Sequence, residues 1–470
     1  MNNMDWVRYS VTFRIAIIGI LALLLLIPVS MVEDLIYERE RVSEEAVSEV
    51  SQKWGEPQVV AGPVLSVPYK KYITNEKGER VSVTQYVHFL PQELSINSVV
   101  EPQIRSRGIF DVVVYSSEID FSGKFAQLNI RDLGIEDIKV DWDNAFISLG
   151  ISDVRGIQDN VKINWNGDEL QFKPGIQTDD VLRNVIQSGG RADTVGLAID
   201  KKTNLGQNSG ISARLPEGVE EGNGFGHTFS FKLNLNGSQE IQFVPVGRTT
   251  EVALKSSWGS PSFNGAFLPD MRTVGDDGFE ASWKIFDLNR GYPQSWIGDT
   301  HNIYSSAFGA KLLITVDGYK KATRSVKYAL LIIALTFLVF FFAEAFNKKR
   351  IHLIQYILVG LSMVLFYALL VSISEIIGFG WAYFISSVAT ISLIVLYSKS
   401  VLANTKMALT QGLILTFLYL FVYIILQLED YALLIGSVLL FSILAVVMYL
   451  SRRVDWYAIG SNTQKDAPRR

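Results

Sequence analysis

Four histidines and an absence of cysteine limit the chemistry open to this 470-residue chain. The histidines are far apart and lack the H-x-x-x-H spacing that puts two ligands on one helix face: His88, His227, His301 and His352. A zinc site needs ligands at short, fixed intervals, so the sequence predicts no metal and no other cofactor. Without cysteine, disulfides, thiolate ligands and cysteine nucleophiles are excluded.

Two serine–lysine pairs are the nearest approach to a nucleophile beside a base: Ser282 with Lys284, and Ser325 with Lys327. These residue types occur together by chance so often that neither pair establishes a dyad. The chain also lacks a G-x-S-x-G elbow, a Walker loop and a G-x-G-x-x-G turn after a strand. We therefore assign no catalytic, cofactor-binding or metal-binding residue.

Aromatic residues gather between residues 258 and 296, among Gly, Pro, Asn and Ser: Trp258, Phe263, Phe267, Trp283, Tyr292 and Trp296. On loops, such rings could stack on sugars or hold a protein partner. We favour the other interpretation, in which they fill space beneath tight turns as part of the core. Asp270 and Asp287 accompany this stretch, and acids at turns usually act as local caps.

Hydrophobic runs are the elements that must position any such site. A bilayer core about 30 Å thick requires roughly 20 apolar residues per spanning helix. Five runs of that length follow one another: Tyr328–Phe346, Leu353–Ile373, Ile377–Tyr397, Met407–Leu428 and Tyr431–Leu450. A sixth, Ile15–Val32, lies near the N-terminus. A cleaved signal peptide is the alternative there, but its apolar core would be shorter and would end in an A-x-A-like site, which is missing.

Basic residues predict the orientation of these six helices, arranged one plus five. They precede the first helix and recur at alternate connections: Arg8, Arg14, Lys348, Lys349, Arg350, Lys399, Lys406, Arg452 and Arg453. The opposite connections carry Glu375, Glu429 and Asp430. Both termini are therefore expected in the cytoplasm. Lys320, Lys321, Arg324 and Lys327 would lie outside, but they follow a long exported segment, and such segments escape the rule.

Few residues inside the apolar runs could serve transport. Glu344 is the only acid within a run, and we expect it to pair with the basic loop at Lys348, one turn away. Thr336, Thr390 and Thr416 could cross-link helices. Small residues also recur in a stripe, Gly378, Ala382, Ser386 and Thr390, with a second pair at Ala432 and Gly436. Such stripes predict close helix packing rather than a substrate path.

The segment between the first two spans predicts a β-rich exported domain that resembles a sandwich. Residues 1–32 form the first span with its tail, and residues 33–55 a stalk helix. Alternating patterns and turn residues at regular spacing then predict strands within residues 56–326, including a hairpin around Asn75. A short helix capped by Thr178 and a sub-domain break near 201–226 are also expected. Residues 327–453 form the helical bundle, and 454–470 a cytoplasmic tail.

Several long stretches resemble the CreD family of bacterial inner-membrane proteins. They include VGRTTEVALKSSWGSPSFNGAFLPD, ASWKIFDLNRGYPQSW, RSVKYALLIIALTFLVFFFAEAF, QYILVGLSMVLFYALLVSISE, EDYALLIGSVLLFS, GPVLSVPY and RSRGIFDVVVYSS. The resemblance is strongest from Phe243 to Tyr457. It implies a Gram-negative inner membrane, a periplasmic domain and a role in envelope integrity, tied to a two-component regulon and to β-lactam and colicin responses. It supplies no catalytic residues.

Three functions follow as expectations. The first is a non-enzymatic sensor or scaffold in the bilayer, whose periplasmic domain recognises an envelope protein or a cell-wall glycan. The second is a membrane enzyme acting on a cell-wall or lipid-linked glycan, which would need carboxylates or a nucleophile converging in a cleft. The third, a carrier, is disfavoured by the lack of ionisable groups at helix centres. The net charge of −4 gives no indication of a nucleic-acid partner. The oligomeric state is left open.

Overall fold

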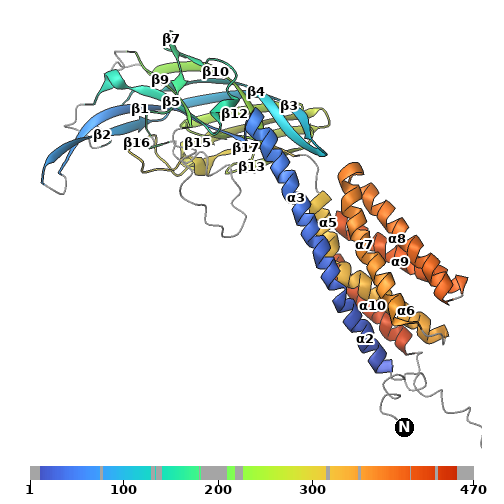
Figure 1. Cartoon of the computed structure of the whole chain (residues 1–470). Coiled ribbons are helices and arrows are strands. Elements are labelled where there is room, and N and C mark those ends of the chain that lie inside the picture. The colour runs from blue at the N-terminus through green and yellow to red at the C-terminus, as the bar shows by residue number, and fades with distance from the viewer. Residues whose placement is uncertain are drawn as a thin grey trace, which may run out of the picture. The chain divides into compact units, whose positions relative to one another are not determined.

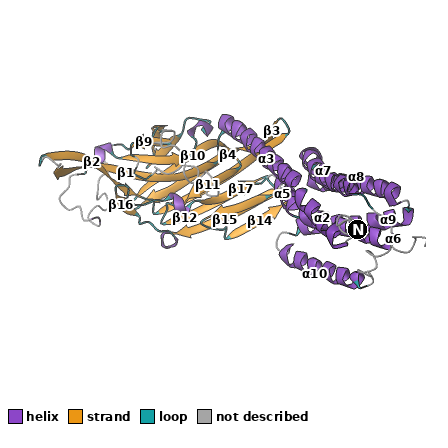
Figure 2. Ribbon diagram, turned by 60° about the horizontal axis from the view of Figure 1, so that its bottom comes forward, coloured by secondary structure: helices purple, strands orange, loops and turns teal. Residues whose placement is uncertain are grey.

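The computed structural model of the chain describes residues 11–74, 78–128, 133, 140–178, 180–181, 209–216, 226–313, 318–347, 351–402, 404–428 and 432–452. Figure 1 labels its elements, and Figure 2 separates helices from strands by colour. The chain divides into two compact units. One comprises Met1–Ser43 with Val316–Arg470, and the other comprises Glu44–Thr315. We call them the helical unit and the β unit.

The helices follow the apolar runs closely. They are α2 (Val11–Leu24), α3 (Leu26–Trp54), α5 (Gly318–Lys327), α6 (Ala329–Asn347), α7 (Leu353–Ile377), α8 (Phe379–Leu402), α9 (Thr405–Gln427) and α10 (Ala432–Ser451). Lipid offers no partner for backbone polar groups, so a long apolar run is forced into a helix. The chain segment of α3 belongs to both units, since the boundary falls after Ser43.

The structure confirms a bundle of apolar helices but does not confirm the expected count of six spans. Among the described residues, four helices are long and apolar enough to cross a membrane, and five if α5 and α6, bent by 45°, form one span. The apolar part of α10, Leu434–Tyr449, is shorter than the others. The predicted stalk helix over residues 33–55 is confirmed, because the helical segment Phe13–Trp54 continues from the first apolar run through residue 32.

Proline accounts for the one interruption in that long helix. Leu25 separates α2 from α3, and Pro28 follows three residues later. Pro28 has no N–H to donate to the carbonyl of Leu24, and its ring crowds that carbonyl. The ladder resumes at once, because Val29 N donates to Leu25 O at 3.2 Å. A helix therefore persists on both sides of the break.

The β unit is built from strands in two sheets. The strands are β1 (Gln58–Thr74), β2 (Arg80–Phe89), β3 (Glu93–Arg107), β4 (Phe110–Phe125), β5 (Phe146–Ile151), β6 (Lys162–Trp165), β7 (Asp168–Gln171), β8 (Lys173–Pro174), β9 (Gly210–Arg214), β10 (His227–Ser238), β11 (Glu240–Val244), β12 (Thr249–Ser256), β13 (Pro261–Gly265), β14 (Met271–Gly275), β15 (Gly278–Phe286), β16 (Ser295–Ile297) and β17 (Phe308–Leu312).

In the described part of the chain, one sheet has the order β13-β17-β11-β1-β5-β9-β8, and off this path β2 pairs with β1 and β16 pairs with β2. The other has the order β14-β15-β12-β3-β4-β10-β6-β7. Two pairs, β1 with β11 and β3 with β12, are parallel, so the sheets are mixed rather than purely antiparallel. The predicted hairpin is confirmed, because β1 and β2 pair from Leu65↔Phe89 to Thr74↔Arg80.

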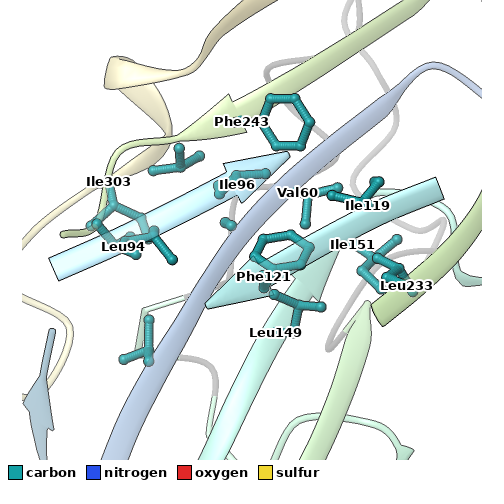
Figure 3. Packing of buried hydrophobic residues seen from close by; sticks show 14 of the residues in the cluster. Val60, Leu94, Ile96, Ile119, Phe121, Leu149, Ile151, Leu233, Phe243 and Ile303 are labelled. Atoms are coloured by element: carbon teal, nitrogen blue, oxygen red, sulfur yellow. The ribbon is translucent and has the colours of Figure 1, made fainter. Parts of the chain in front are cut away.

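One hydrophobic cluster joins the two sheets. Figure 3 shows Val60, Leu149 and Phe243 from the first sheet packed near Ile96 and Phe121 from the second. All of these side chains are at most 1% exposed. The β-rich prediction is therefore confirmed, and the shared core gives the unit a sandwich-like arrangement.

Two predicted features fall largely on residues outside the described ranges. The short helix after Thr178 is one of them; of this segment, the structure shows only that the Thr178 hydroxyl accepts a hydrogen bond from Asp180 N at 3.3 Å. The sub-domain break near 201–226 is the other. Its described part includes β9, which pairs with β5 in the first sheet.

Candidate functional site

A three-residue polar cluster of Arg39, Glu375 and Tyr319 lies in the helical unit. Arg39 of α3 donates two hydrogen bonds to Glu375 of α7, from Nε to Oε1 and from a terminal nitrogen to Oε2, each at 2.7 Å. The hydroxyl of Tyr319, on α5, donates to Glu375 Oε1 at 2.7 Å. The Glu375 side chain is only 10% exposed. A bidentate arginine–carboxylate pair fixes geometry as well as charge.

This Glu375 cluster joins three helices that are distant in sequence. Arg39 and Glu375 are 336 positions apart. Arg39 lies just before the point where the chain leaves the helical unit, and Tyr319 lies just after the point where it returns. The Glu375 carboxylate therefore binds one residue near each of the two points at which the chain passes from one unit to the other.

A second cluster of the same residue types lies at the other end of α7. Arg14 of α2 forms an ion pair with Glu344 of α6, and the Tyr356 hydroxyl donates to Glu344 Oε2 at 3.4 Å. Glu344 and Glu375 thus each bind one arginine from the N-terminal helices and one tyrosine. The N-terminal segment is attached to the rest of the helical unit at two places.

The predicted partner of Glu344, the basic loop at Lys348, lies in a part of the chain that the structure does not describe, so that pairing stays a prediction. Among the described residues, Glu344 forms its ion pair with Arg14. Sequence spacing favoured the basic loop because only local neighbours can be identified from periodicity. The acidic turn predicted around Glu375 is likewise the last turn of α7, and its carboxylate is paired.

The other polar residues inside the helices bond locally or pack. The hydroxyls of Thr336 and Thr416 donate to carbonyls four residues earlier in their own helices, Ile332 and Gly412, at 2.7 and 2.8 Å. Within the described ranges, each hydroxyl therefore bonds inside its own helix, whereas the sequence allowed for bonds between helices. Within the small-residue stripe, Ala382, Ser386 and Thr390 are at most 3% exposed on α8.

The stripe is shorter than predicted at both places. Gly378 is the residue that ends α7, with φ +79°, and a Cβ there would meet nothing within 4 Å. Gly436 on α10 also faces open space. Sequence analysis missed a closer approach at Gly360 of α7, where an added Cβ would lie 2.1 Å from the Leu25 side chain. A glycine in the middle of an apolar run was the available signal.

A Ser–His–Asp constellation lies inside the β unit. Ser66 Oγ is 2.9 Å from Nδ1 of His88, and Nε2 of His88 is 3.4 Å from Oδ2 of Asp180. These are the residue types of a hydrolase triad. However, Ser66 is 1% exposed and His88 is 0% exposed. Burial lowers the pKa of His88, although Asp180 opposes the shift.

This arrangement satisfies a buried histidine, and it gives a substrate no access to the Ser66 hydroxyl. Ser66 and His88 lie directly opposite each other in the β1–β2 hairpin, so their pairing follows from the strand register. The contribution of Asp180 depends on a distant segment and could not be predicted from the hairpin. Both ring nitrogens of His88 thus have partners, and this matters because leaving a buried polar atom without a hydrogen bond costs free energy.

The aromatic stretch 258–296 belongs to the core. Trp283, Tyr292 and Trp296 are 2%, 6% and 3% exposed, and all belong to the hydrophobic cluster. Three further rings pack against the cluster while partly buried: Trp258, Phe263 and Phe267. The favoured interpretation, that these rings fill the core, is confirmed for Trp283, Tyr292 and Trp296, although strands β13, β15 and β16 run through a stretch that looked like loops and turns. The strands were missed because Gly, Asn and Pro weakened the alternation.

The serine–lysine pairs do not form dyads among the described residues. Lys284 Nζ binds Glu251 at 2.8 Å on the outer face of its strand. Ser325 is fully buried, and its hydroxyl has no hydrogen-bond partner in the described part of the chain. The carboxylate of Asp270 accepts from Lys284 N at 2.7 Å, and Asp287 pairs with Arg248 at 3.2 Å. Both acids therefore have local partners.

The remaining histidines have separate surroundings. Nδ1 of His227 lies 2.8 Å from Nδ2 of Asn166, and Nδ1 of His301 lies 2.8 Å from Oγ1 of Thr300. His352 caps the start of α7. No group of three or more His, Asp or Glu within the described ranges could hold a metal ion.

The last turns of α3 are anchored within the β unit. The Trp54 Nε1–H donates to the carbonyl of Tyr115 at 3.1 Å, and the guanidinium of Arg105 lies 4.9 Å above the Trp54 ring. Arg107 adds an ion pair with Glu49 at 2.9 Å. Helix α3 thus makes specific contacts inside each unit, at Arg39 in one and at Trp54 in the other.

Comparison with known proteins gives a consistent result over nearly the whole chain. The family model described as "Inner membrane protein CreD" matches residues 10–457. The Inner membrane protein CreD of Escherichia coli (strain K12) is 31% identical over 441 residues, which cover 93% of this chain and 91% of that protein.

Proposed function

This chain belongs to the CreD family of inner membrane proteins, and from that premise we propose that it supports cell-envelope integrity as a non-enzymatic sensor or scaffold. Its β unit faces the periplasm and recognises an envelope protein or a cell-wall glycan. Its helical unit crosses the bilayer six times, with both termini in the cytoplasm. The basic residues at alternate helix connections support that orientation.

The Glu375 cluster carries this proposal. Both segments that link the β unit to the helical unit carry a residue bound to this one carboxylate. A displacement of either segment would break a hydrogen bond to a group that is nearly removed from water. Leaving such a charge unpaired is strongly unfavourable, so the state of the β unit would be felt at α7.

An enzyme acting on a cell-wall or lipid-linked glycan receives less support. The triad-like residues found among the described residues are buried, and the acids of the aromatic stretch have local partners. A sensor or scaffold requires only recognition and connection, and the contacts of α3 at Arg39 and at Trp54 support the connection.

A charge exchange tests the role of the cluster. Cells lacking the protein would receive the wild type, Arg39→Glu, Glu375→Arg or the double variant, and survival under envelope stress would be measured at matched protein levels. Each single variant places two like charges together, so we expect loss of protection. The double variant restores the ion pair and should recover much of it.

Arg107→Glu is the matched control, because it reverses an exposed ion pair in the β unit. Its partner Glu49 is 40% exposed and Arg107 is 60% exposed, so the change should leave survival unaltered. Full protection by both single cluster variants, at normal abundance, would show that the cluster does not carry the function.

A further inference from the structure

Helix α5 concentrates positive charge on one side. Its ten residues contain no acid and four basic residues: Lys320, Lys321, Arg324 and Lys327. Successive residues of an α-helix are about 100° apart, so Lys320, Arg324 and Lys327 lie within about 60° of one another. Ala322 and Val326 are 1% and 4% exposed and lie on the other side of the helix. The three cations thus form a stripe turned away from the packed face, which we call the basic stripe.

The basic stripe lies where the apolar helices end. Helix α6 is 19 residues long, or roughly 28 Å, and so it nearly spans a hydrocarbon layer of about 30 Å without α5. Helix α5 precedes it at a bend of 45°. The Tyr319 hydroxyl reaches Glu375 in the last turn of α7, and Lys321 Nζ donates to Oε1 of Gln427, the last residue of α9, at 3.3 Å. Helix α5 is therefore level with the ends of α7 and α9, where a bilayer has its headgroups.

Both outer members of the basic stripe are available to a ligand. Lys320 and Lys327 are exposed, and neither has an ion-pair or hydrogen-bond partner in the described part of the chain. Other cations of the helical unit are instead paired inside it, Arg14 with Glu344 and Arg39 with Glu375. The ammonium groups of Lys320 and Lys327 therefore carry positive charge that no described acid neutralises.

An anionic phospholipid headgroup is the occupant whose charge complements the basic stripe. Its phosphate is held at this level by acyl chains, which insert beside apolar helices. Lysine side chains near a helix end extend toward the headgroups, and each cation at an anionic membrane surface strengthens binding about fivefold. A soluble anion would lack this attachment to the bilayer. The predicted orientation also puts these cations on the side where basic residues are usually scarce, so orienting the helices does not explain them.

We propose that the basic stripe of α5 binds the headgroup of an anionic phospholipid at the membrane surface, with Lys320 and Lys327 contacting its phosphate. The site is separate from the Arg39–Glu375 ion pair. The proposal does not depend on the sensor or scaffold function, and it holds for either orientation of the chain, because α5 lies at a membrane surface in both.

A comparison of two lipids on the purified full chain tests this site. Phosphatidylglycerol is anionic and phosphatidylethanolamine is zwitterionic, and both are used with the same acyl chains. Native mass spectrometry measures the binding constant of each, and we expect the wild type to bind phosphatidylglycerol more tightly. The double variant Lys320→Gln with Lys327→Gln should weaken phosphatidylglycerol binding by about fivefold for each charge lost. Binding of phosphatidylethanolamine should not change.

Two further double variants separate the site from charge in general. Lys320→Arg with Lys327→Arg keeps both charges and should keep the preference for phosphatidylglycerol. Lys70→Gln with Lys71→Gln removes the same charge from exposed positions on β1, and it should bind both lipids as the wild type does. The proposal is overturned if the wild type shows no preference, or if the Lys320 and Lys327 glutamine variant binds phosphatidylglycerol normally. Equal weakening of both lipids by that variant, or equal weakening by the β1 variant, would also overturn it.

Discussion

Trp296 illustrates how the aromatic residues of the β unit act at the scale of single side chains. Its ring centroid lies 5.6 Å from those of His88 and His301 and 6.5 Å from that of Tyr292. Offset and edge contacts of this kind add to the free energy gained by burying ring area. These contacts place Trp296 in the interior of a cluster rather than on a recognition surface.

Replacing Trp296 by Ala should therefore act through folding. Removing a buried aromatic side chain costs roughly 3–5 kcal/mol of stability, and we expect a lower melting temperature and less protein in the membrane. Thermal unfolding of the full chain in detergent measures the first effect, and immunoblotting measures the second. Leu288→Ala is the control, because Leu288 is 93% exposed. Lost envelope protection at unchanged stability and abundance would instead indicate a binding role for Trp296.

At the scale of elements, α8 shows what small residues do in a membrane helix. Ala382, Ser386 and Thr390 are buried along one side, and α8 packs against both α7 and α9. Without a hydrophobic effect to drive helices together, close van der Waals contact is the main source of association. Small side chains permit that contact.

Ala382→Leu should consequently loosen the helical unit. Added bulk in a closely packed site typically costs about 1–3 kcal/mol, because neighbouring side chains must shift. The melting temperature of the detergent-solubilised protein is the measurement. Gly436→Leu makes a comparable addition where a Cβ meets open space, and it should have little effect. Equal melting temperatures for Ala382→Leu and the wild type would show that α8 does not need a small residue at 382.

The elements also show which parts of the fold could be predicted. Strand β4, Phe110–Phe125, lies within the segment predicted to form strands, since alternation and flanking turns are local signals. Helices α6 to α10 follow the apolar runs, because lipid offers no hydrogen-bond partner to backbone polar groups and a helix satisfies them internally. The long strand β3 was missed because Pro102 and a polar outer face obscured its alternation, although Leu94, Ile96 and Val100 all point to the core.

Pairings between distant elements were beyond sequence analysis. Arg39 and Glu375 each looked like an ordinary charged residue near a helix end, and no periodic pattern connects positions 336 apart. The Ser66–His88 contact could be inferred from the hairpin register, but the approach of Asp180 could not. The charged cluster depends on how α3, α5 and α7 assemble.

At the scale of the whole molecule, the proposed topology remains to be tested. Reporter fusions after Arg350, Lys406 and Arg453 should report a cytoplasmic location, because each follows a basic connection. Fusions at positions between 60 and 310 should report a periplasmic one. Alkaline phosphatase and green fluorescent protein make complementary reporters for the two compartments. Cytoplasmic signals from the β unit would reverse the proposed orientation of every helix.

The two arginine–glutamate–tyrosine clusters have a consequence for the choice of membrane. Tyr356 and Glu375 are 19 positions apart on α7, or roughly 28 Å along its axis. The charged ends of this helix are therefore separated by nearly the average hydrocarbon thickness of about 30 Å. In a thicker bilayer, hydrophobic mismatch would draw one ion pair toward the acyl chains, whereas a thinner bilayer would leave apolar turns in the headgroups. The spacing of the two clusters along α7 thus matches the hydrocarbon thickness of an average bilayer.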